Sequence, residues 1–350
     1  MKILKKSHCL LFIVASIATN AHSEVKYVKE CIGHYKYDLP DSSYPGLLPV
    51  SILEGRIDAN YARFPNGEKV FPRYENQLQY QTYWFVFEAK DKNDSIKYSE
   101  KKLERFKQKK KEQLASSLDF EREEGKGYHY KRVDDTLYLM NKKAYNAMFF
   151  WGNYGYFFGG EFNNFTINNN DIKMQSNRAL IAPRRLNEIP QNGLCIPMAT
   201  LKETDMKDLD LTANYQLLDY PEVTFSLQES VTTNQDYQEK PNRDWIDMRL
   251  ITVANHHSEN TKIHLIGSPR YRSRSLGDKQ GLEVLSQYIS RESKKPVYLY
   301  IARMIADKPG DSSLTFLAYL DESNAKNNPL PVEEFEKIMT RIVDSIERRK

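Results

Sequence analysis

The sequence predicts an α+β fold of two domains, each an antiparallel sheet with packed helices. Short segments of alternating apolar and polar residues recur between Gly, Pro and Asn clusters, which is the pattern of hairpins and antiparallel strands. The final segment instead repeats apolar residues at helical spacing. A length of 350 residues, at about 150 residues per domain, indicates roughly two domains. With 12% aromatic and 28% charged residues, the composition excludes disordered, collagen-like and multi-spanning membrane chains.

The first 23 residues have the three parts of a secretory signal peptide. A basic segment, MKILKK, precedes an apolar run over Cys9–Ala18, which is shorter than the ~20 residues of a membrane-spanning helix. Small residues at Ala21 and Ser23 then predict cleavage before Glu24. We therefore expect residues 1–23 to be removed on export and the mature protein to work in the periplasm.

The net charge of the mature chain is small. The whole sequence carries a formal charge of +4, and the leader holds three lysines and no acid, so a charge of +1 remains after cleavage. A charge of this size gives no general attraction for nucleic acid or for an anionic membrane. We expect neither partner, and no integral membrane segment in the mature chain.

Cys31 and Cys195 are the two cysteines that remain once the leader is removed. In an oxidising compartment they are a natural disulfide pair, and chain entropy gives a bond across their 164-residue separation a value of about 4–5 kcal/mol. Two separate thiols are the alternative that the sequence leaves open. Because zinc sites need several closely spaced Cys or His ligands, two distant cysteines predict no metal site.

We place a domain boundary near residue 200, so that residues 24–200 form an N-terminal domain and residues 201–350 a C-terminal domain. Lys202–Tyr220 supports this position because it is polar and shows no sheet signal. A capping serine and a spaced apolar face predict a helix over Ser99–Leu118 in the first domain. Aromatic and β-branched residues there predict strands at Tyr35–Leu39, Val50–Arg56 and Leu78–Lys90, and hairpins at Tyr128–Met140 and Ala144–Phe162.

The second domain is predicted to hold a further antiparallel sheet. Two of its short apolar segments, Gly281–Arg291 and Ser312–Asp321, fit either a strand or a short helix. The segments that read as strands are Pro221–Val231, Ile246–Ala254, Lys262–Gly267 and Pro296–Ala306.

The C-terminal segment carries the strongest helical pattern of the chain. Apolar residues recur at spacings of three and four from Val332 to Ile346, and Pro331 stands where a helix takes its first turn. We expect a long amphipathic helix that packs its apolar stripe on the preceding sheet. The residues expected at its C-terminal end, where positive charge is favourable, are Arg348, Arg349 and Lys350.

Motifs of catalysis and cofactor binding are missing from the sequence. It contains no Gly-x-Ser-x-Gly, His-Glu-x-x-His, P-loop or Gly-x-Gly-x-x-Gly pattern. The segment Gly310–Leu314 (GDSSL) is similar to a serine-esterase block, but no histidine follows His264 and Pro309 favours a turn. The adjacent His256 and His257 would point to opposite faces of a strand and could not share one ion. We therefore expect no catalytic residue, metal or cofactor.

Two groups of side chains are candidates for contact with a protein partner, because aromatic residues and arginine dominate binding energy at interfaces. The first group, on the aromatic hairpin, is Tyr154, Tyr156 and Phe157. The second group alternates along a segment that would place three guanidinium groups on one strand face: Arg270, Arg272 and Arg274. A structural interpretation stays open for both, since aromatics fill cores and charges protect edge strands. With export, the two groups favour a binding protein over an enzyme.

Three segments resemble one protein family. The mature chain opens on Cys31-Ile32-Gly33-His34-Tyr35 and Leu39-Pro40, and the second cysteine lies in Gly193-Leu194-Cys195-Ile196-Pro197. The third segment runs from a basic strand through Gly281-Leu282-Glu283 and Pro309-Gly310 to a helix ending in Ser345-Ile346-Glu347-Arg348. In order and spacing they are similar to the two-domain periplasmic immunity proteins that neutralise lipase (phospholipase) effectors of bacterial type VI secretion systems. His34 stands where that family usually has arginine.

The resemblance implies a function. It implies an inhibitor that binds a cognate lipase or phospholipase effector, an α/β-hydrolase, in the periplasm and protects the producing cell from its own toxin. Two other functions stay open on the residues alone: a periplasmic or secreted hydrolase with an unrecognised site, and a non-catalytic envelope protein that binds a lipid or another ligand.

Overall fold

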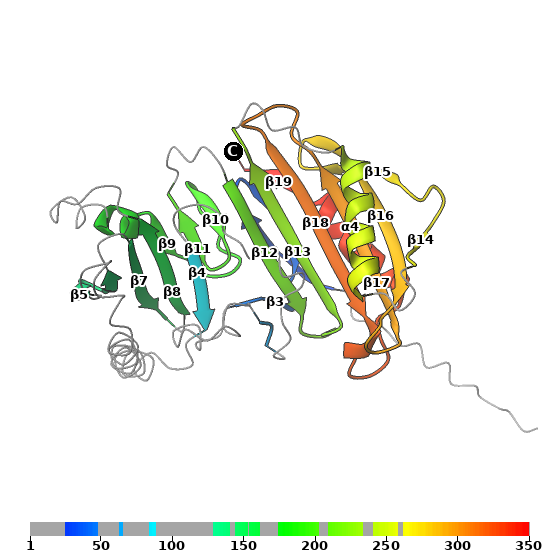
Figure 1. Cartoon of the computed structure of the whole chain (residues 1–350), viewed down its shortest axis with the longest axis horizontal. Coiled ribbons are helices and arrows are strands. Elements are labelled where there is room, and N and C mark those ends of the chain that lie inside the picture. Colours follow the sequence, from blue (N-terminus) through cyan, green and yellow to red (C-terminus); the bar gives the residue numbers. More distant parts are fainter. Residues whose placement is uncertain are drawn as a thin grey trace, which may run out of the picture.

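The computed structural model describes residues 25–47, 63–65, 84–88, 129–140, 144–152, 154–161, 174–202, 209–233, 241–257 and 262–349. Within these residues, antiparallel strands make up most of the fold and helices are few, so the α+β protein is mostly β (Figure 1). The predicted signal peptide, the predicted strand Val50–Arg56 and the predicted helix Ser99–Leu118 lie outside the described residues.

The largest layer is an eight-stranded antiparallel sheet with the order β14-β16-β17-β18-β13-β12-β3, in which β15 also pairs with β16. Its strands are β3 (Ser43–Pro45), β12 (Leu209–Leu217), β13 (Val223–Val231), β14 (His264–Ile266), β15 (Arg272–Leu276), β16 (Lys279–Ile289), β17 (Pro296–Met304) and β18 (Ser312–Asp321). The two ambiguous segments are therefore strands, and the Pro309-Gly310 segment before β18 is a turn, as predicted.

The expectation that Lys202–Tyr220 has no sheet signal is wrong, because this segment contains strand β12. Its residues alternate strictly, with the apolar set Leu209, Leu211, Ala213, Tyr215 and Leu217 buried on one face. Between them stand Asp, Thr, Asn and Gln, of which Asp and Asn are individually poor strand formers. The low propensity of these residues hid the period-two pattern, and burial of the apolar face decided the structure.

The predicted strand at Ile246–Ala254 is wrong, because this segment lies within helix α4 (Asn242–His257). Ile246, Leu250 and Val253 are buried at helical spacing and pack on β16, β17 and β18 (Figure 1). A short apolar run rich in Ile, Leu and Val fits either element, and the chain around it supplies the length of a helix.

Helix α5 (Val332–Asp344) packs on the opposite face of the sheet. It buries Phe335, Ile338, Met339, Ile342 and Val343, which is the stripe expected from the sequence. These side chains join Leu314 and Phe316 of β18 in one cluster, while the alternate residues Leu317 and Tyr319 face α4. The two helices thus cover the two faces of one sheet.

The expectation that Arg348 and Arg349 lie at the end of the C-terminal helix is wrong, and Lys350 lies outside the described residues. The helix stops at Asp344, with Ser345 as its cap, and the chain continues into β19 (Glu347–Arg348). This strand pairs with β2 (Tyr35–Pro40), which itself pairs with β1 (Tyr27–Ile32). Backbone pairing with the N-terminal hairpin therefore holds the end of the chain.

Two smaller sheets complete the fold. A five-stranded sheet has the order β4-β8-β7-β6-β5 and contains both predicted hairpins. Its strands are β4 (Trp84–Glu88), β5 (His129–Val133), β6 (Thr136–Met140), β7 (Ala144–Trp151) and β8 (Tyr154–Glu161). A three-stranded sheet of β9 (Ile181–Pro183), β10 (Leu194–Ile196) and β11 (Ala199–Leu201) lies between it and the large sheet (Figure 1). One buried cluster draws residues from both halves of the chain, and the division near residue 200 stays a prediction.

Candidate functional site

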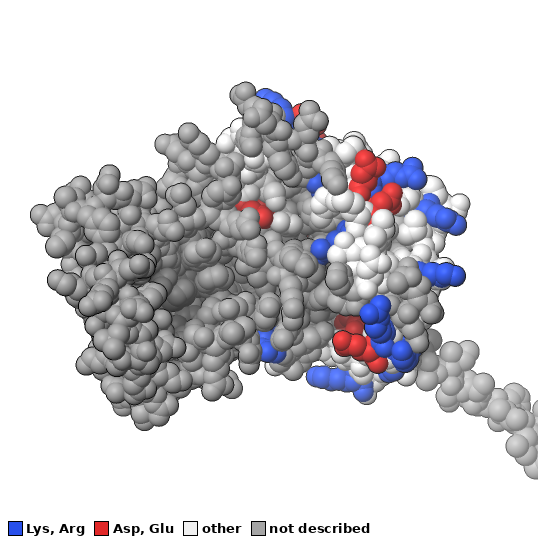
Figure 2. All heavy atoms as spheres, in the orientation of Figure 1, with Lys and Arg blue, Asp and Glu red and all other residues white. Residues whose placement is uncertain are grey.

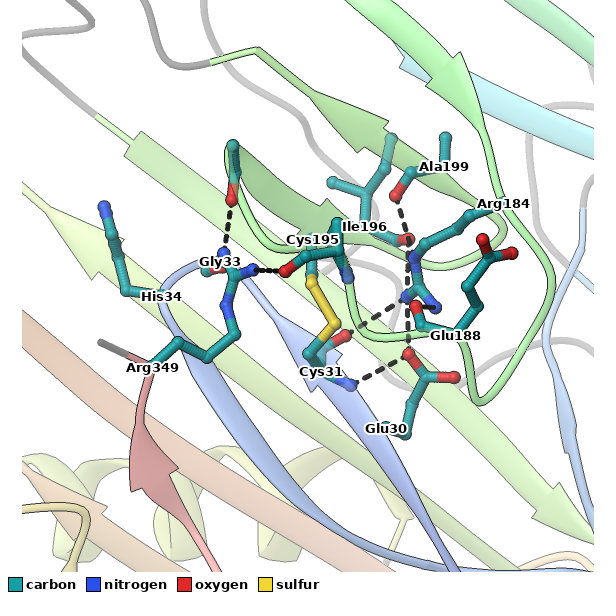
Figure 3. Close-up of a disulfide and its surroundings, with 12 residues drawn as sticks. Glu30, Cys31, Gly33, His34, Arg184, Glu188, Cys195, Ile196, Ala199 and Arg349 are labelled. Atoms are coloured by element: carbon teal, nitrogen blue, oxygen red, sulfur yellow. Dashed lines mark hydrogen bonds and ion pairs between the residues drawn. A yellow bond between two sulfur atoms is a disulfide. The ribbon is translucent and has the colours of Figure 1, made fainter.

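A disulfide joins Cys31 at the end of β1 to Cys195 in β10, as the sequence predicted (Figure 3). The two Cα atoms are 5.6 Å apart. Beside the bond, the backbone N–H of Gly33 donates to the carbonyl of Cys195 (2.7 Å), and the N–H of Cys195 donates back to Gly33 (3.0 Å). The N-terminal hairpin is thereby fixed to the small sheet by one covalent bond and a pair of hydrogen bonds. We call this region the junction.

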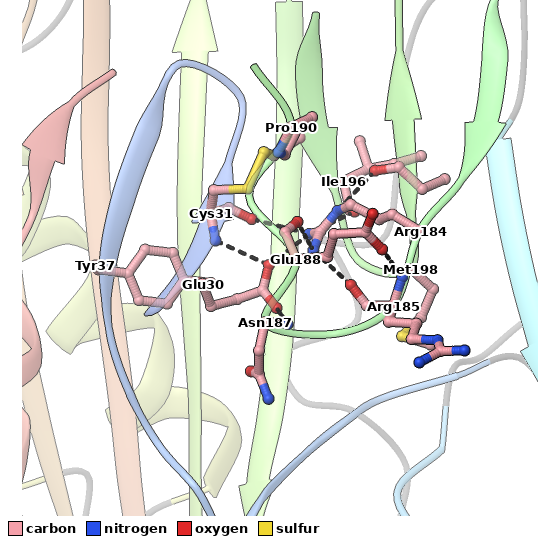
Figure 4. Close-up of polar contacts among 12 residues, drawn as sticks. Glu30, Cys31, Tyr37, Arg184, Arg185, Asn187, Glu188, Pro190, Ile196 and Met198 are labelled. Carbon is pink, nitrogen blue, oxygen red and sulfur yellow. Dashed lines mark hydrogen bonds and ion pairs between the residues drawn. A yellow bond between two sulfur atoms is a disulfide. The ribbon is translucent and has the colours of Figure 1, made fainter. Parts of the chain in front are cut away.

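A buried ion pair lies directly under the disulfide (Figure 4). Arg184 Nη2 is 2.5 Å from Glu30 Oε1, and the two residues are 2% and 0% exposed. The carboxylate also accepts the backbone N–H groups of Cys31 and Asn187, each at 2.8 Å. Such a charge is tolerated in a protein interior because both partners find several hydrogen bonds.

The Arg184 guanidinium also donates to backbone carbonyls of β1, of the loop that follows β9 and of the β10–β11 hairpin. Its carbonyl acceptors are those of Cys31, Arg185, Glu188, Ile196 and Ala199. The arginine therefore ties β1 to the three-stranded sheet. Sequence reasoning missed this pair; a lone glutamate beside a cysteine in an otherwise apolar strand end was the available signal.

Arg349 closes the junction from the C-terminus. Its side chain donates to the backbone carbonyls of Gly33 (2.8 Å), Pro190 (3.0 Å) and Gly193 (Figure 3). Its backbone N–H donates to the backbone carbonyl of His34 (2.7 Å). This arginine, expected at a helix end, instead binds the hairpin and the loop that precedes Cys195. Segments from the first, middle and last parts of the described chain meet here.

A second buried carboxylate, Glu229 of β13, faces the same hairpin. It is fully buried and accepts the backbone N–H of His34 (2.8 Å) and the hydroxyl of Ser312 (2.6 Å), and it lies 2.7 Å from His34 Nδ1. The carboxylate stands between the serine and the histidine, so His34 cannot take a proton from Ser312. Ser312 is also only 4% exposed. Ser312, Glu229 and His34 are therefore not arranged as a serine nucleophile with its base.

The Gly33→Ala substitution is expected to lower the free energy of unfolding by about 3 kcal/mol, as measured by urea denaturation. Gly33 has a φ of +52°, and a Cβ there would lie 1.6 Å from Glu229 Oε2, so the carboxylate and its hydrogen bonds must move. Gly152→Ala is the matched control, because Gly152 has a φ of +58° and open space around it. Equal losses in the two variants would show that backbone strain alone matters.

The predicted arginine strand is engaged within the protein. Arg272 and Arg274 lie in β15 and both reach the fully buried Glu283, at 2.8 Å and 2.7 Å. Arg272 also pairs with Glu336 (2.5 Å) and Arg274 with Asp344 (2.7 Å), both on α5. These contacts attach α5 to the edge of the sheet. Arg270 precedes the strand and is exposed, so the expectation of three guanidinium groups on one strand face is wrong.

The electrostatics of this cluster follow from its pairing. Burial alone would raise the pKa of Glu283, but hydrogen bonds from Arg274 and Tyr300 and the charges of Arg272 and Arg274 bring the pKa below its ordinary value. The hydrogen bond to Glu283 likewise raises the pKa of Arg274. Both groups are therefore held in their charged forms at neutral pH.

The aromatic hairpin is divided between core and surface. Tyr156 is 2% exposed; its ring stacks on Phe149 at 4.7 Å and its hydroxyl donates to the carbonyl of Met198 (2.7 Å). Burial raises its pKa. The predicted contact residue Tyr156 thus packs inside the protein, which is the alternative noted for this hairpin. The side chain of Phe157 lies outside the described residues.

Exposed aromatic surface lies at the tip of this hairpin. Tyr154 is half-buried, and its cross-strand partner Trp151 is 39% exposed. Sequence reasoning did not single out Trp151; its place next to the Gly152 turn was the signal. Tryptophan and tyrosine at an exposed turn are typical of residues that contact a protein partner.

Among the described residues, no group of three or more His, Cys, Asp or Glu side chains could hold a metal ion. No helix of this part of the chain is long and apolar enough to cross a membrane.

Comparisons with known proteins give matches in fold alone. No protein-family model matches the chain, and no curated protein matches it in sequence. A chain in the crystal structure of the Tle4–Tli4 complex matches with a TM-score of 0.51 and 16% identity, over 92% of this chain and 97% of that one. The apo structure of TplEi, a type VI secretion immunity protein of Pseudomonas aeruginosa, matches with a TM-score of 0.52 and 15% identity, over 92% and 97%.

The chain shares its fold with the immunity protein TplEi. A second structure of TplEi, in complex with "L" peptide, matches with a TM-score of 0.52 and 14% identity, over 92% of this chain and 98% of that one. The shared fold therefore extends over nearly the full length of both chains, and the resemblance inferred from three short segments is confirmed at the level of the fold.

Proposed function

We propose that this protein is an immunity protein that binds and inhibits a cognate lipase or phospholipase effector of a type VI secretion system in the periplasm. One observation carries the proposal: the fold match to the immunity protein TplEi covers 92% of this chain. The short segments around Cys31, Cys195 and the C-terminal helix support it independently, since they resemble the family that neutralises lipase effectors.

The architecture suits an inhibitor. A protein that inhibits by binding needs a surface held in one conformation, because ordering mobile segments on binding reduces affinity. The disulfide, the Glu30–Arg184 pair and the Arg349 contacts hold three distant parts of the chain together. The disulfide is also consistent with an oxidising compartment such as the periplasm.

We further propose that the effector contacts the tip of the aromatic hairpin, through Trp151 and Tyr154, and the exposed Arg270. Tyr154 and Arg270 belong to the two predicted groups, and Trp151 is the exposed cross-strand partner of Tyr154. Arg272 and Arg274 are occupied by Glu283, Glu336 and Asp344, so their contribution is to shape this edge of the protein.

The central test is a titration of effector activity. Mature protein, residues 24–350, is added to the purified lipase encoded beside its gene while phospholipid hydrolysis and the mass of the complex are recorded. We expect activity to disappear at an equimolar ratio, with a stable one-to-one complex. Undiminished hydrolysis at a tenfold excess, without a complex, would refute the proposal. Ester turnover by this protein alone would instead support a hydrolase.

The double change Trp151→Ala and Tyr154→Ala is expected to weaken binding to the effector at least tenfold, because truncating a single aromatic hot spot costs about 2 kcal/mol or more. Isothermal titration calorimetry measures the effect. Leu218→Ala serves as the control, since Leu218 is a 48% exposed apolar residue in the β12–β13 turn. Unchanged affinity in the aromatic variant would remove the hairpin tip from the interface.

A further inference from the structure

Helices α4 and α5 differ in the side chains that they expose. The most exposed residues of α5 are all charged: Glu333, Lys337, Arg341 and Asp344. In α4, Met248 and Ile251 are 40% and 60% exposed. Figure 2 shows this part of the surface as an uncharged patch bordered by charged side chains. The charged residues of α5 thus lie on its exposed face, as in a solvated helix, whereas α4 exposes apolar side chains.

Four exposed residues of α4 form one stripe. Asp244, Met248, Ile251 and Asn255 follow each other at spacings of four, three and four, so they share one face, which we call the outward stripe. The opposite face already supplies the burial that holds α4 on the sheet. Met248 and Ile251 therefore add little to folding. A helix with apolar side chains on both faces is typical of one covered on both faces.

Charge is distributed unevenly along the outward stripe. Beside its N-terminal end, the neighbouring residues Arg243 and Asp247 lie 3.9 Å apart and offset each other. At its C-terminal end, Arg291 donates to the carbonyl of Asn255 (3.3 Å), which places the β16–β17 turn beside the helix. That turn, residues 290–295, exposes Arg291, Lys294 and Lys295 against a single acid, Glu292. We call it the basic turn.

We propose that the outward stripe and the basic turn form a second docking surface for the effector, in addition to the hairpin tip. The part of the effector that fits is an apolar protrusion with acidic side chains beside it, since these complement Met248 and Ile251 on one side and the basic turn on the other. This inference rests on the proposed function.

A protein partner fits this surface better than a membrane. A helix that lies on a bilayer presents a broad apolar face with basic residues on its polar face. In α4 the broad apolar face packs on the sheet, and the outward stripe has two apolar residues with Asp244 at one end. A narrow stripe of this kind is suited to a pocket or ridge of matching shape.

The test is a titration of the neighbouring lipase with three variants of the mature protein. Ile251→Glu is expected to raise the concentration for half-maximal inhibition at least tenfold. Lys294→Glu with Lys295→Glu is expected to raise it severalfold and to weaken its dependence on salt. Leu218→Glu places the same charge on a similarly exposed apolar residue and is expected to inhibit like the wild type. Circular dichroism melts check that every variant is folded.

The outcomes separate this inference from the proposed function. If the wild type inhibits and Ile251→Glu inhibits equally well, α4 is not a docking surface, although the immunity function stands. If the wild type neither binds nor inhibits, both proposals fail. Sedimentation of the wild type as a dimer that Ile251→Glu dissociates, or flotation with anionic phosphatidylglycerol vesicles that Ile251→Glu abolishes, would assign the stripe to another occupant and overturn the inference.

Discussion

Arg184→Met is expected to lower the free energy of unfolding by about 3–5 kcal/mol, one of the two largest effects that we expect from a change in this protein. The change leaves the Glu30 carboxylate fully buried and without its cationic partner. It also removes the donor that serves carbonyls of β1 and of the three-stranded sheet. Urea denaturation followed by tryptophan fluorescence measures the loss.

A double-mutant cycle separates the charge from the packing. Glu30→Gln keeps the shape of the side chain but removes its charge, so adding it to Arg184→Met should restore about 1 kcal/mol or more. In the wild-type background the same change should destabilise, because Arg184 then loses its anion. If Glu30→Gln restores nothing in the Arg184→Met background, the loss came from the carbonyl contacts.

The second large effect is expected from the disulfide. Replacing Cys31 and Cys195 together by serine should lower the free energy of unfolding by up to about 5 kcal/mol, because the bond closes a separation of 164 residues and restricts the unfolded chain. The measurement is urea denaturation of the purified double variant. Both cysteines are changed so that no free thiol remains.

Reduction of the wild type provides the control for the serine variant. Unfolding in dithiothreitol should give the midpoint of the double variant, while the variant itself should not respond to the reductant. Coincident curves for oxidised and reduced wild type would show that the bond does not contribute to stability. The hydrogen bonds between Gly33 and Cys195 would then hold the junction alone.

Both effects concern the junction, which also bears on the proposed function. It joins the N-terminal hairpin, the three-stranded sheet and the C-terminus, while the proposed contact residues lie elsewhere, at the tip of the β7–β8 hairpin and on α4. In the proposed function, the junction holds these surfaces in place before the effector binds, which reduces the entropic cost of binding.

Local patterns in the sequence were sufficient for several elements. The strand β2, the hairpins β5–β6 and β7–β8 and the strands β13, β14 and β17 lie where alternation predicted them. The apolar stripe of α5 was readable because its period extends over more than three turns. The cysteine pair followed from the number of cysteines and the predicted compartment. In each case the information lies within one short segment or in a simple count.

The sequence was insufficient where several segments compete or combine. Strand β12 was missed because burial of one face outweighs the low strand propensity of Asp and Asn, and α4 was read as a strand because its apolar run fits both elements. The arginines of β15 could not be assigned to the interior without Glu283 and α5 beside them. Arg349 could not be separated from a helix-end residue without the hairpin that it binds.

The sequence by itself thus determined the α+β class, the C-terminal apolar stripe and the family resemblance, and it favoured the cysteine pair that the structure joins. The tertiary structure alone decided that Glu30 pairs with Arg184, that Tyr156 is buried while Trp151 is exposed, and that α4 presents apolar side chains outward. The physical reason is distance along the chain. Periodicity and propensity act over a few neighbouring residues, whereas the Glu30–Arg184 pair spans 154 positions and forms only when the sheets assemble around it.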